Sequence, residues 1–182
     1  FCEGGHLGYM LNNSKPVYAE RRVLYIKPGI FIINDVFYAQ EKHVYDMYYH
    51  VNNLGRLENE GDNTEKNIHR LKYTSDLNTA QFVILGKNTT STIIEGNVSR
   101  HYNEEESSPV IKASWESDGF TSVFTVIGLN SDRLSVKKVP VLSNYKNAVF
   151  PDSMIEALEV DIPGSKKAYT AVFAHQEYAS PT

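Results

Sequence analysis

Short blocks of alternating apolar and polar residues recur along the whole chain, and this pattern constrains the fold more than any other feature of the sequence. In residues 43–51, HVYDMYYHV, every second side chain would point to the same side of a strand. A period of two is typical of β-strands, whereas an amphipathic helix repeats about every 3.6 residues. About ten such blocks follow one another at spacings of roughly 8–12 residues. The sequence therefore predicts an all-β fold, an antiparallel two-sheet β-sandwich of about ten or more strands with at most one short helix.

Two turns are predicted between neighbouring blocks. Residues 16–28 and 29–39 are separated by Pro28-Gly29, which indicates a hairpin of two long strands. Residues 30–33 are apolar on both faces, which favours a central strand covered on both sides. Asp118-Gly119 separates residues 109–117 from residues 120–128 and is a strong hairpin signal.

The other segments divide into strands, one loop and one undecided stretch. Residues 52–67 are polar and rich in turn residues, so we expect a long loop there. Residues 151–160 begin with Pro151 and Asp152, a helix start signal, but their length suits a strand equally well. Further strands are expected at residues 69–75, 80–86, 89–96, 133–143 and 167–178.

Length and composition favour a self-supporting domain over residues 1–182. The chain has 182 residues, 41% of them hydrophobic, which is enough for a sizeable core. The longest apolar block, residues 29–33, is far shorter than the about 18 residues of a membrane span, so we expect none. The single cysteine, Cys2, excludes an internal disulfide and a cysteine-based zinc site. The chain begins with Phe1 and without a signal-peptide pattern, so we expect a mature form, an excised domain or a proteolytic piece.

The charge balance argues against a nucleic-acid partner. Eighteen Lys and Arg against 22 Asp and Glu give a net charge of −4, and no basic stripe is visible. The same charge balance argues against strong binding of a polyanion by this chain alone. The acidic run Glu104-Glu105-Glu106 is expected to be a solvated loop.

Two clusters of polar residues lie on predicted strands. His43, Asp46 and His50 do not suit a single metal ion: Asp46 and His50 would lie roughly 13 Å apart along the strand, and His43 would point to the other face. Arg21 and Arg22, next to Glu20, would point to opposite faces of a strand, so one of them goes inward or to an interface, and pairing across the hairpin with Asp35 or Glu41 is the expected use.

A second group of residues suggests contact with a ligand. Arg100, His101 and Tyr102 are residue types that neutralise a carboxylate and transfer protons, although neighbouring strand residues point to opposite faces. The chain holds 12 tyrosines, and an exposed tyrosine can stack on a sugar ring. Trp115 is expected in the core. The candidates for sugar stacking are Tyr45, Tyr48, Tyr49 and Tyr102.

The first fifty residues carry a specific resemblance to a known family. The run EGGHLGYMLNNSKPVYAERRVLYIKPGIFIINDVFYAQEKHVYDMYYHV resembles the heparinase II/III-like polysaccharide lyases. Later segments resemble the family more loosely, at Ser99, at Tyr102-Asn103 and at Ala174-His175-Gln176. The matching positions of the first run are His6, Gly8, Tyr9, Val17, Arg22, Val23, Asp35, His43 and His50.

The resemblance implies a division of labour within a larger enzyme. Such lyases join an N-terminal α/α-toroid to C-terminal antiparallel β-sandwich modules, and they cleave acidic polysaccharides by β-elimination at a uronic acid. The resemblance implies that the catalytic and metal-binding residues belong to the toroid and the early sandwich strands, which would precede Phe1. We therefore expect no catalytic, cofactor-binding or metal-binding residue in this chain. The expected cleft-edge or interface residues are His6, Tyr9, Arg22, Arg100, His101 and Tyr102.

Three functions remain open at this stage. The first is an accessory β-sandwich, the C-terminal part of a periplasmic or extracellular lyase, whose partners are the missing toroid and, through the whole enzyme, an acidic polysaccharide. The second is an autonomous carbohydrate-binding module that uses surface tyrosines. The third is a small independent lyase site at Arg100, His101 and Tyr102.

Overall fold

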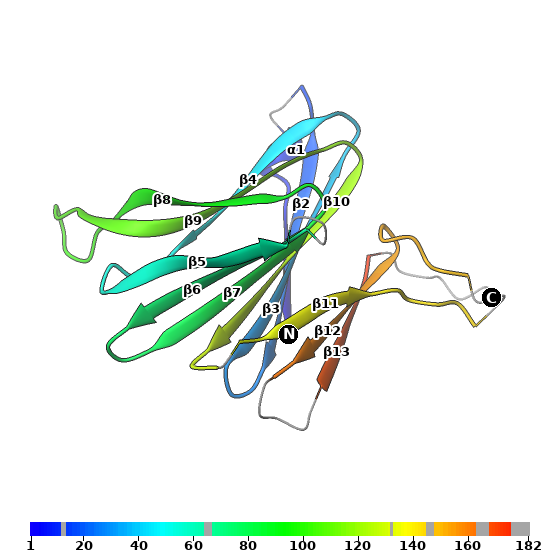
Figure 1. Cartoon of the computed structure of the whole chain (residues 1–182). Coiled ribbons are helices and arrows are strands. Elements are labelled where there is room, and N and C mark those ends of the chain that lie inside the picture. The colour runs from blue at the N-terminus through cyan, green and yellow to red at the C-terminus, as the bar shows by residue number, and fades with distance from the viewer. Residues whose placement is uncertain (12–13, 64–66, 132, 145–147, 163–167, 176–182) are drawn as a thin grey trace. The chain divides into compact units, whose positions relative to one another are not determined.

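The computed structural model describes residues 1–11, 14–63, 67–131, 133–144, 148–162 and 168–175. The chain divides into two compact units, Phe1–Ser131 and Asp132–Thr182 (Figure 1). Each is described by itself below, and the expected single domain over residues 1–182 stays a prediction.

The larger unit contains two antiparallel sheets. Its seven-stranded sheet has the order β1-β2-β3-β10-β7-β6-β5, and its three-stranded sheet the order β4-β9-β8. One helical turn, α1 (Gly8–Leu11), follows β1. The strands of the large sheet are β1 (Cys2–His6), β2 (Val17–Ile26), β3 (Ile30–Ala39), β5 (Gly55–Asn63), β6 (Ile68–Ser75), β7 (Thr79–Gly86) and β10 (Phe120–Leu129), and those of the small sheet are β4 (His43–His50), β8 (Thr90–Val98) and β9 (Glu106–Ser117).

Side chains from both sheets form one core between them. Tyr45 and Trp115 of the small sheet stack with ring centroids 5.4 Å apart, and Phe37 of the large sheet lies 4.9 Å from Tyr45. Trp115 is buried, as expected. The two sheets therefore make a sandwich, and in Figure 1 β8 and β9 of the small sheet lie above β5, β6 and β7 of the large sheet. The buried core residues are Val17, Tyr45, Met47, Leu57, Leu71, Phe82, Ile84, Ile111, Ala113, Trp115 and Val123.

The hairpin predicted at Pro28-Gly29 is confirmed. β2 and β3 pair over their whole length, from Val17 opposite Ala39 to Ile26 opposite Ile30. β3 lies between β2 and β10, and residues on both of its faces are buried. The central position expected for residues 30–33 is therefore confirmed.

Two local predictions for this unit are wrong. Asp118-Gly119 does form a turn, with Gly119 at a φ of 68°, but β9 and β10 belong to different sheets and do not form a hairpin. Each of them already has a strand on both sides, so the turn carries the chain from one sheet to the other.

The predicted loop over residues 52–67 contains the strand β5. β5 is an edge strand that pairs with β6 through its backbone, and a bulge between Asn59 and Gly61 interrupts the register. Leu57 is its buried core residue. A strand with so few apolar side chains lacks the alternation by which strands are recognised.

The smaller unit is a three-stranded antiparallel sheet, β11 (Ser135–Val139), β12 (Ile155–Asp161) and β13 (Ala168–Ala174), with β12 in the middle. The helical alternative for residues 151–160 is wrong. Pro151 instead begins a tight turn whose carbonyl accepts a hydrogen bond from the Met154 amide, and β12 follows it. β11 and β13 are shorter than predicted, and residues 176–178 of the last expected strand lie outside the described part of the chain.

Candidate functional site

The N-terminal segment, residues 1–11, lies at an edge of the large sheet and is exposed throughout. β1 pairs with β2 from Cys2 opposite Val23 to His6 opposite Ala19. Gly5 lies so close to the Tyr18 side chain that a Cβ atom at this position would collide with the Tyr18 hydroxyl. The glycine thus lets β1 approach β2 closely.

The matched polar residues of this segment hold it in place. The rings of His6 and Tyr9 lie 5.1 Å apart, which ties α1 back to β1. Arg22, expected at a cleft edge or interface, is instead buried, with its Nε 2.5 Å from Glu20 and 3.4 Å from Glu3. Arg22 therefore anchors β1 to β2, while Tyr9 remains exposed.

The second candidate group lies on another projection, the turn of residues 99–105 between β8 and β9. Tyr102 is fully exposed and His101 is exposed. Arg100 donates hydrogen bonds to the side-chain oxygens of Asn52 and Asn53, and its Nε lies 4.0 Å from Glu106. The structure brings His6 and Tyr9 together and places Arg22 beside Glu3 of the same segment, whereas Arg100, His101 and Tyr102 lie on the separate turn between β8 and β9 (Figure 1).

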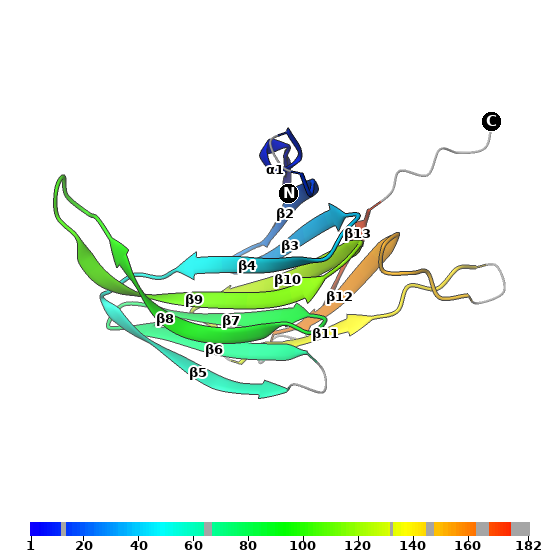
Figure 2. The ribbon, with the colours of Figure 1, turned by 90° about the horizontal axis from the view of Figure 1, so that it is seen from above.

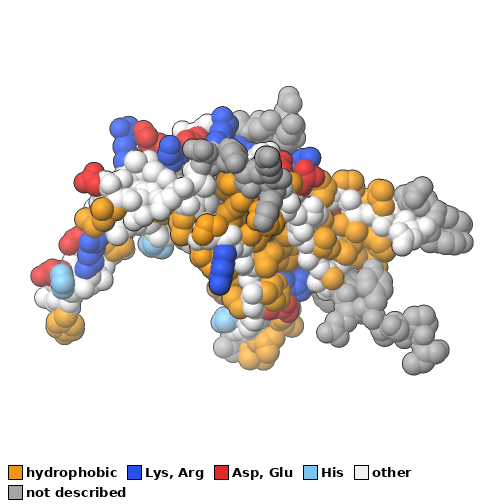
Figure 3. Space-filling view, turned by 90° about the horizontal axis from the view of Figure 1, so that it is seen from below, with side chains coloured by type: hydrophobic (Ala, Val, Ile, Leu, Met, Phe, Trp, Pro, Cys, Tyr) orange, Lys and Arg blue, Asp and Glu red, His pale blue; other side chains and the backbone are white. Residues whose placement is uncertain are grey.

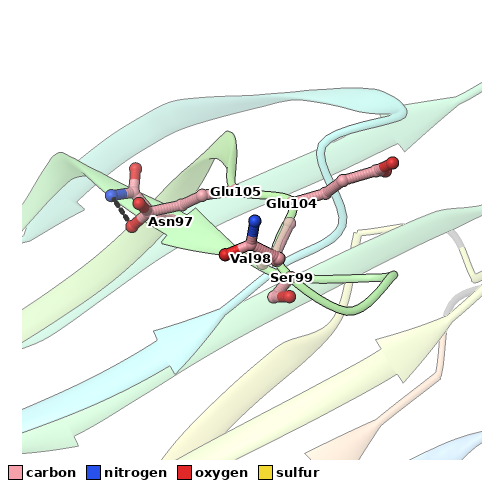
Figure 4. A pocket seen from close by; sticks show the side chains of 6 residues that line it. Asn97, Val98, Ser99, Glu104 and Glu105 are labelled. Carbon is pink, nitrogen blue, oxygen red and sulfur yellow. Dashed lines mark hydrogen bonds between the residues drawn. The ribbon is translucent and has the colours of Figure 1, made fainter.

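A shallow hollow lies beside this turn (Figure 4). Asn97 donates a hydrogen bond to Glu105 across it, at 2.5 Å. Two carboxylates give it a negative character that disfavours an acidic polymer. Its lining residues are Asn97, Val98, Ser99, Asn103, Glu104 and Glu105.

Arg21 on β2 and Asp35 on β3 form a cross-strand pair, one of those that the sequence leaves open. The Nε and one terminal nitrogen of Arg21 donate to the two Asp35 oxygens at 2.6 and 3.0 Å. Burial raises the pKa of Asp35, and Arg21 offsets only part of that rise. Burial, together with the Asp35 charge, raises the pKa of neighbouring Tyr49 to about 12. A phenol with so high a pKa is protonated near neutral pH and is therefore a poor general base there.

β4 separates its side chains as predicted. Tyr45 and Met47 point into the core, whereas Asp46 and Tyr48 lie on the outer face. Asp46 accepts hydrogen bonds from Ser114 at 2.6 Å and Tyr48 at 3.2 Å and pairs with Lys112 at 3.0 Å, which together lower its pKa. The Lys112 amino group also lies 5.7 Å from the Tyr48 ring centroid.

Neither a metal-binding group nor a membrane-spanning helix is found in the part of the chain that the structure describes. His43 and His50 do not join Asp46 in a group of three ligands there. No helix among these residues is long and apolar enough to cross a membrane.

Apart from Tyr9, the exposed apolar residues of the N-terminal segment are not among the site residues predicted from the sequence. Leu7, Met10 and Leu11 are exposed around the matched Tyr9. The signal was present in the run LGYML, which is apolar but too short to read as a strand or a helix.

No protein-family model and no curated protein sequence matches the chain. Solved structures do match it. Heparan sulfate lyase HepC from Pedobacter heparinus aligns with a TM-score of 0.64 and 16% identity, over 90% of this chain and 25% of that one. The heparinase III that is the BT4657 gene product gives 0.61 and 14%, over 94% and 27%. A further heparinase III gives 0.60 and 13%, also over 94% and 27%.

The chain has the fold of one part of heparinase III. It spans about a quarter of the length of these lyases. The match to HepC covers 90% of the chain and so extends into both compact units. The resemblance expected from the sequence is thus confirmed at the level of the fold.

Proposed function

We propose that this chain is an accessory β-sandwich module, not catalytic alone, of a heparinase II/III-like lyase that cleaves uronic-acid-containing polysaccharides by β-elimination. The observation that carries the proposal is the asymmetry of the fold match. The three lyases cover 90–94% of this chain, but the chain covers only 25–27% of each lyase. We infer that the module is the C-terminal part of such an enzyme.

The arginines support an accessory role. β-Elimination at a uronic acid needs a cation for the carboxylate, together with an acid and a base in one site. Arg21 is paired with Asp35, and Arg22 is buried with Glu20. Arg100 is held by Asn52 and Asn53. Each of these guanidinium groups therefore already has a partner within the chain.

The position of His101 and Tyr102 argues in the same direction. Both are exposed on a projecting turn, where water surrounds any bound substrate. Electrostatic stabilisation of a developing charge is far weaker in such a place than in a dry cleft. This weakens the case for an independent lyase site on the turn.

The alternative is an autonomous carbohydrate-binding module. It is favoured by the exposed rings of Tyr48 and Tyr102. Tyr45, however, belongs to the core, and Tyr49 packs against that core. Tyr48 and Tyr102 come from the middle of β4 and from the turn after β8, so they do not form the paired platform that this function needs.

The partners and the location follow from the proposed role. The protein partner would be the toroid of the same polypeptide, and the polysaccharide would be bound by the whole enzyme. Because such polymers are met outside the cytoplasm, we infer a periplasmic or extracellular location.

An unsaturated-uronate absorbance assay tests the proposal. It compares this chain with the full-length protein that contains it, on heparan sulfate and on alginate. We expect absorbance to rise only with the full-length protein. Turnover by the isolated chain would contradict an accessory role, and the substitutions His101→Ala and Tyr102→Phe would then locate the active groups. Failure of the full-length protein on every uronate polymer would overturn the lyase assignment itself.

A further inference from the structure

The N-terminal segment exposes an unusual concentration of large apolar side chains. Leu11 is 77% exposed, and Tyr9 is more than half exposed. Surface apolar residues are ordinary when scattered, but a contiguous group of them marks an interaction site. The exposed apolar side chains of this segment are Phe1, Leu7, Tyr9, Met10 and Leu11.

The local structure of this segment is incomplete by itself. α1 is a single turn of four residues, held by bonds from the Met10 and Leu11 amides to the Leu7 carbonyl, and none of its residues is buried. A helix this short is far below the length that is stable in water without packing. Every residue of β1 is also exposed. Yet Gly5, His6 and Arg22 hold the segment in a defined place, which indicates a surface built to be covered.

A second projection lies on the same side of the larger unit. The turn carrying Tyr102 curves toward the side on which β1 and α1 stand (Figure 2). Figure 3 shows both projections from the opposite direction, each ending in hydrophobic side chains. A partner seated between them would contact both.

We propose that these two projections, residues 1–11 and 99–105, form the surface on which the larger part of a lyase polypeptide docks. This inference rests on the proposed function and names the surface that serves it. The matched lyases are roughly four times as long as the region that this chain covers, so a lyase of that kind contains a large further body.

The chemistry of the surface selects a protein over the polysaccharide. The charged side chain of the N-terminal segment, Glu3, is engaged by Arg22. On the turn, Arg100 is engaged by asparagines, and Glu104 and Glu105 add negative charge. A polyanion needs exposed cations, whereas apolar side chains with a tyrosine at the centre are typical of protein interfaces.

Hydrogen–deuterium exchange tests the surface in the full-length protein. We expect the amides of residues 1–11 and 99–105 to exchange at least about tenfold more slowly there than in the isolated chain, because docking suppresses local opening. The turn at Leu77 provides the control, since this leucine is 87% exposed in the same unit but lies in neither projection. Its exchange should be the same in both proteins. Equal exchange of the projections in both proteins would overturn the proposal.

Matched substitutions sharpen the test. Leu11→Asp in the full-length protein should abolish the added protection and split one thermal unfolding transition into two, whereas Leu77→Asp should do neither. Protection retained in the Leu11→Asp variant would contradict the assignment. Protection that appears in the isolated chain as its concentration rises would assign the surface to a second copy and likewise overturn it.

The absorbance assay separates this inference from the proposed function. If the full-length protein cleaves uronate polymers but the amides of the two projections are not protected from exchange, the docking surface is refuted and the proposed function is not. If these amides are protected in a full-length protein that has no lyase activity, the proposed function is refuted and the docking surface is not. If the natural polypeptide is no longer than this chain, both fail.

Discussion

Arg21 and Asp35 form an ion pair whose two members differ in exposure: the Arg21 side chain is 49% exposed and that of Asp35 only 6%. Removing the guanidinium with Arg21→Met should therefore leave a buried carboxylate without its partner. We expect a loss of about 2 kcal/mol in unfolding free energy at pH 7, below the full cost of a deeply buried pair because solvent reaches Arg21. Urea denaturation measures it. Arg56→Met is the control: Arg56 pairs with Glu58 in an exposed ion pair, so its loss should cost less than about 0.5 kcal/mol.

The pH dependence of the Arg21→Met effect identifies its cause. The pKa of Asp35 is raised in the folded state, so Asp35 favours folding most when it is protonated, and this contribution falls as the pH rises through the shifted pKa. Without Arg21 the pKa of Asp35 rises further. The destabilisation should therefore be largest at pH 7 and shrink toward about pH 4, near the ordinary Asp value. A cost independent of pH would show that Arg21 acts through packing and not through its charge.

Tyr45 and Tyr48 lie on opposite faces of the same strand and separate a core role from a sugar-binding role. Tyr45→Ala should cost about 3–5 kcal/mol, because it removes a ring stacked on Trp115 in the core. Tyr48→Ala should cost less than about 1 kcal/mol. Urea denaturation measures both variants. Titration with heparan sulfate oligosaccharides should show no binding that depends on Tyr48; loss of measurable binding in Tyr48→Ala would favour the carbohydrate-binding module.

At the scale of elements, the attachment of β1 depends on Gly5. A Cβ atom at Gly5 would collide with the Tyr18 hydroxyl, whereas one at Gly4 would meet nothing within 4 Å. Gly5→Val should therefore weaken the pairing of β1 with β2 by about 1–3 kcal/mol. Gly4→Val serves as the control and should leave that pairing within about 0.5 kcal/mol of its original strength. Exchange of the amides of residues 2–6 reports the difference, and equal rates in the two variants would refute the role of Gly5.

The strands that can be located from the sequence are those in which the pattern of apolar and polar side chains reflects which faces are buried. The alternation in β4 and the double burial of β3 follow directly from the sequence. The sequence does not reveal β5, because an edge strand is held by backbone hydrogen bonds, and these leave little trace in the pattern of side chains. The sequence leaves β12 undecided because Pro151 begins a turn as readily as a helix, and only pairing with two neighbours decides for the strand.

The residues of the candidate site also differ in whether the sequence pattern indicates their environment. The sequence predicts a pair between one of the two arginines and Asp35 or Glu41, because opposite charges often face each other across a hairpin, and the register of β2 and β3 decides for Arg21 with Asp35. The sequence predicts Arg22 at a cleft edge or interface, but it lies under β1 with Glu20 and Glu3. Its burial depends on an edge strand packing beside it, and the alternation of β2 itself carries no record of that strand.

At the scale of the whole molecule, charge and exposure suit the proposed protein partner better than a polyanion. The net charge is −4. The large apolar side chains of residues 1–11 are exposed, while several lysines are paired with carboxylates. A domain of this kind gains more by covering apolar surface than by attracting a polyanion. Exposed apolar surface combined with a negative net charge suits the proposed accessory module, in which the substrate cleft would lie in another part of the enzyme.

Immobilised heparin provides the corresponding whole-molecule measurement. The isolated chain should pass through a heparin column at about 0.15 M salt, because its net charge is −4 and its sequence shows no basic stripe to release counterions from the polymer. The double substitution Glu104→Lys, Glu105→Lys should increase retention by making the turn basic, which shows that the column reports this surface. Retention of the unsubstituted chain above about 0.3 M salt would mean that it recognises the polyanion directly. The acidic hollow beside Asn97 would then have to be reassigned, since its carboxylates oppose such binding.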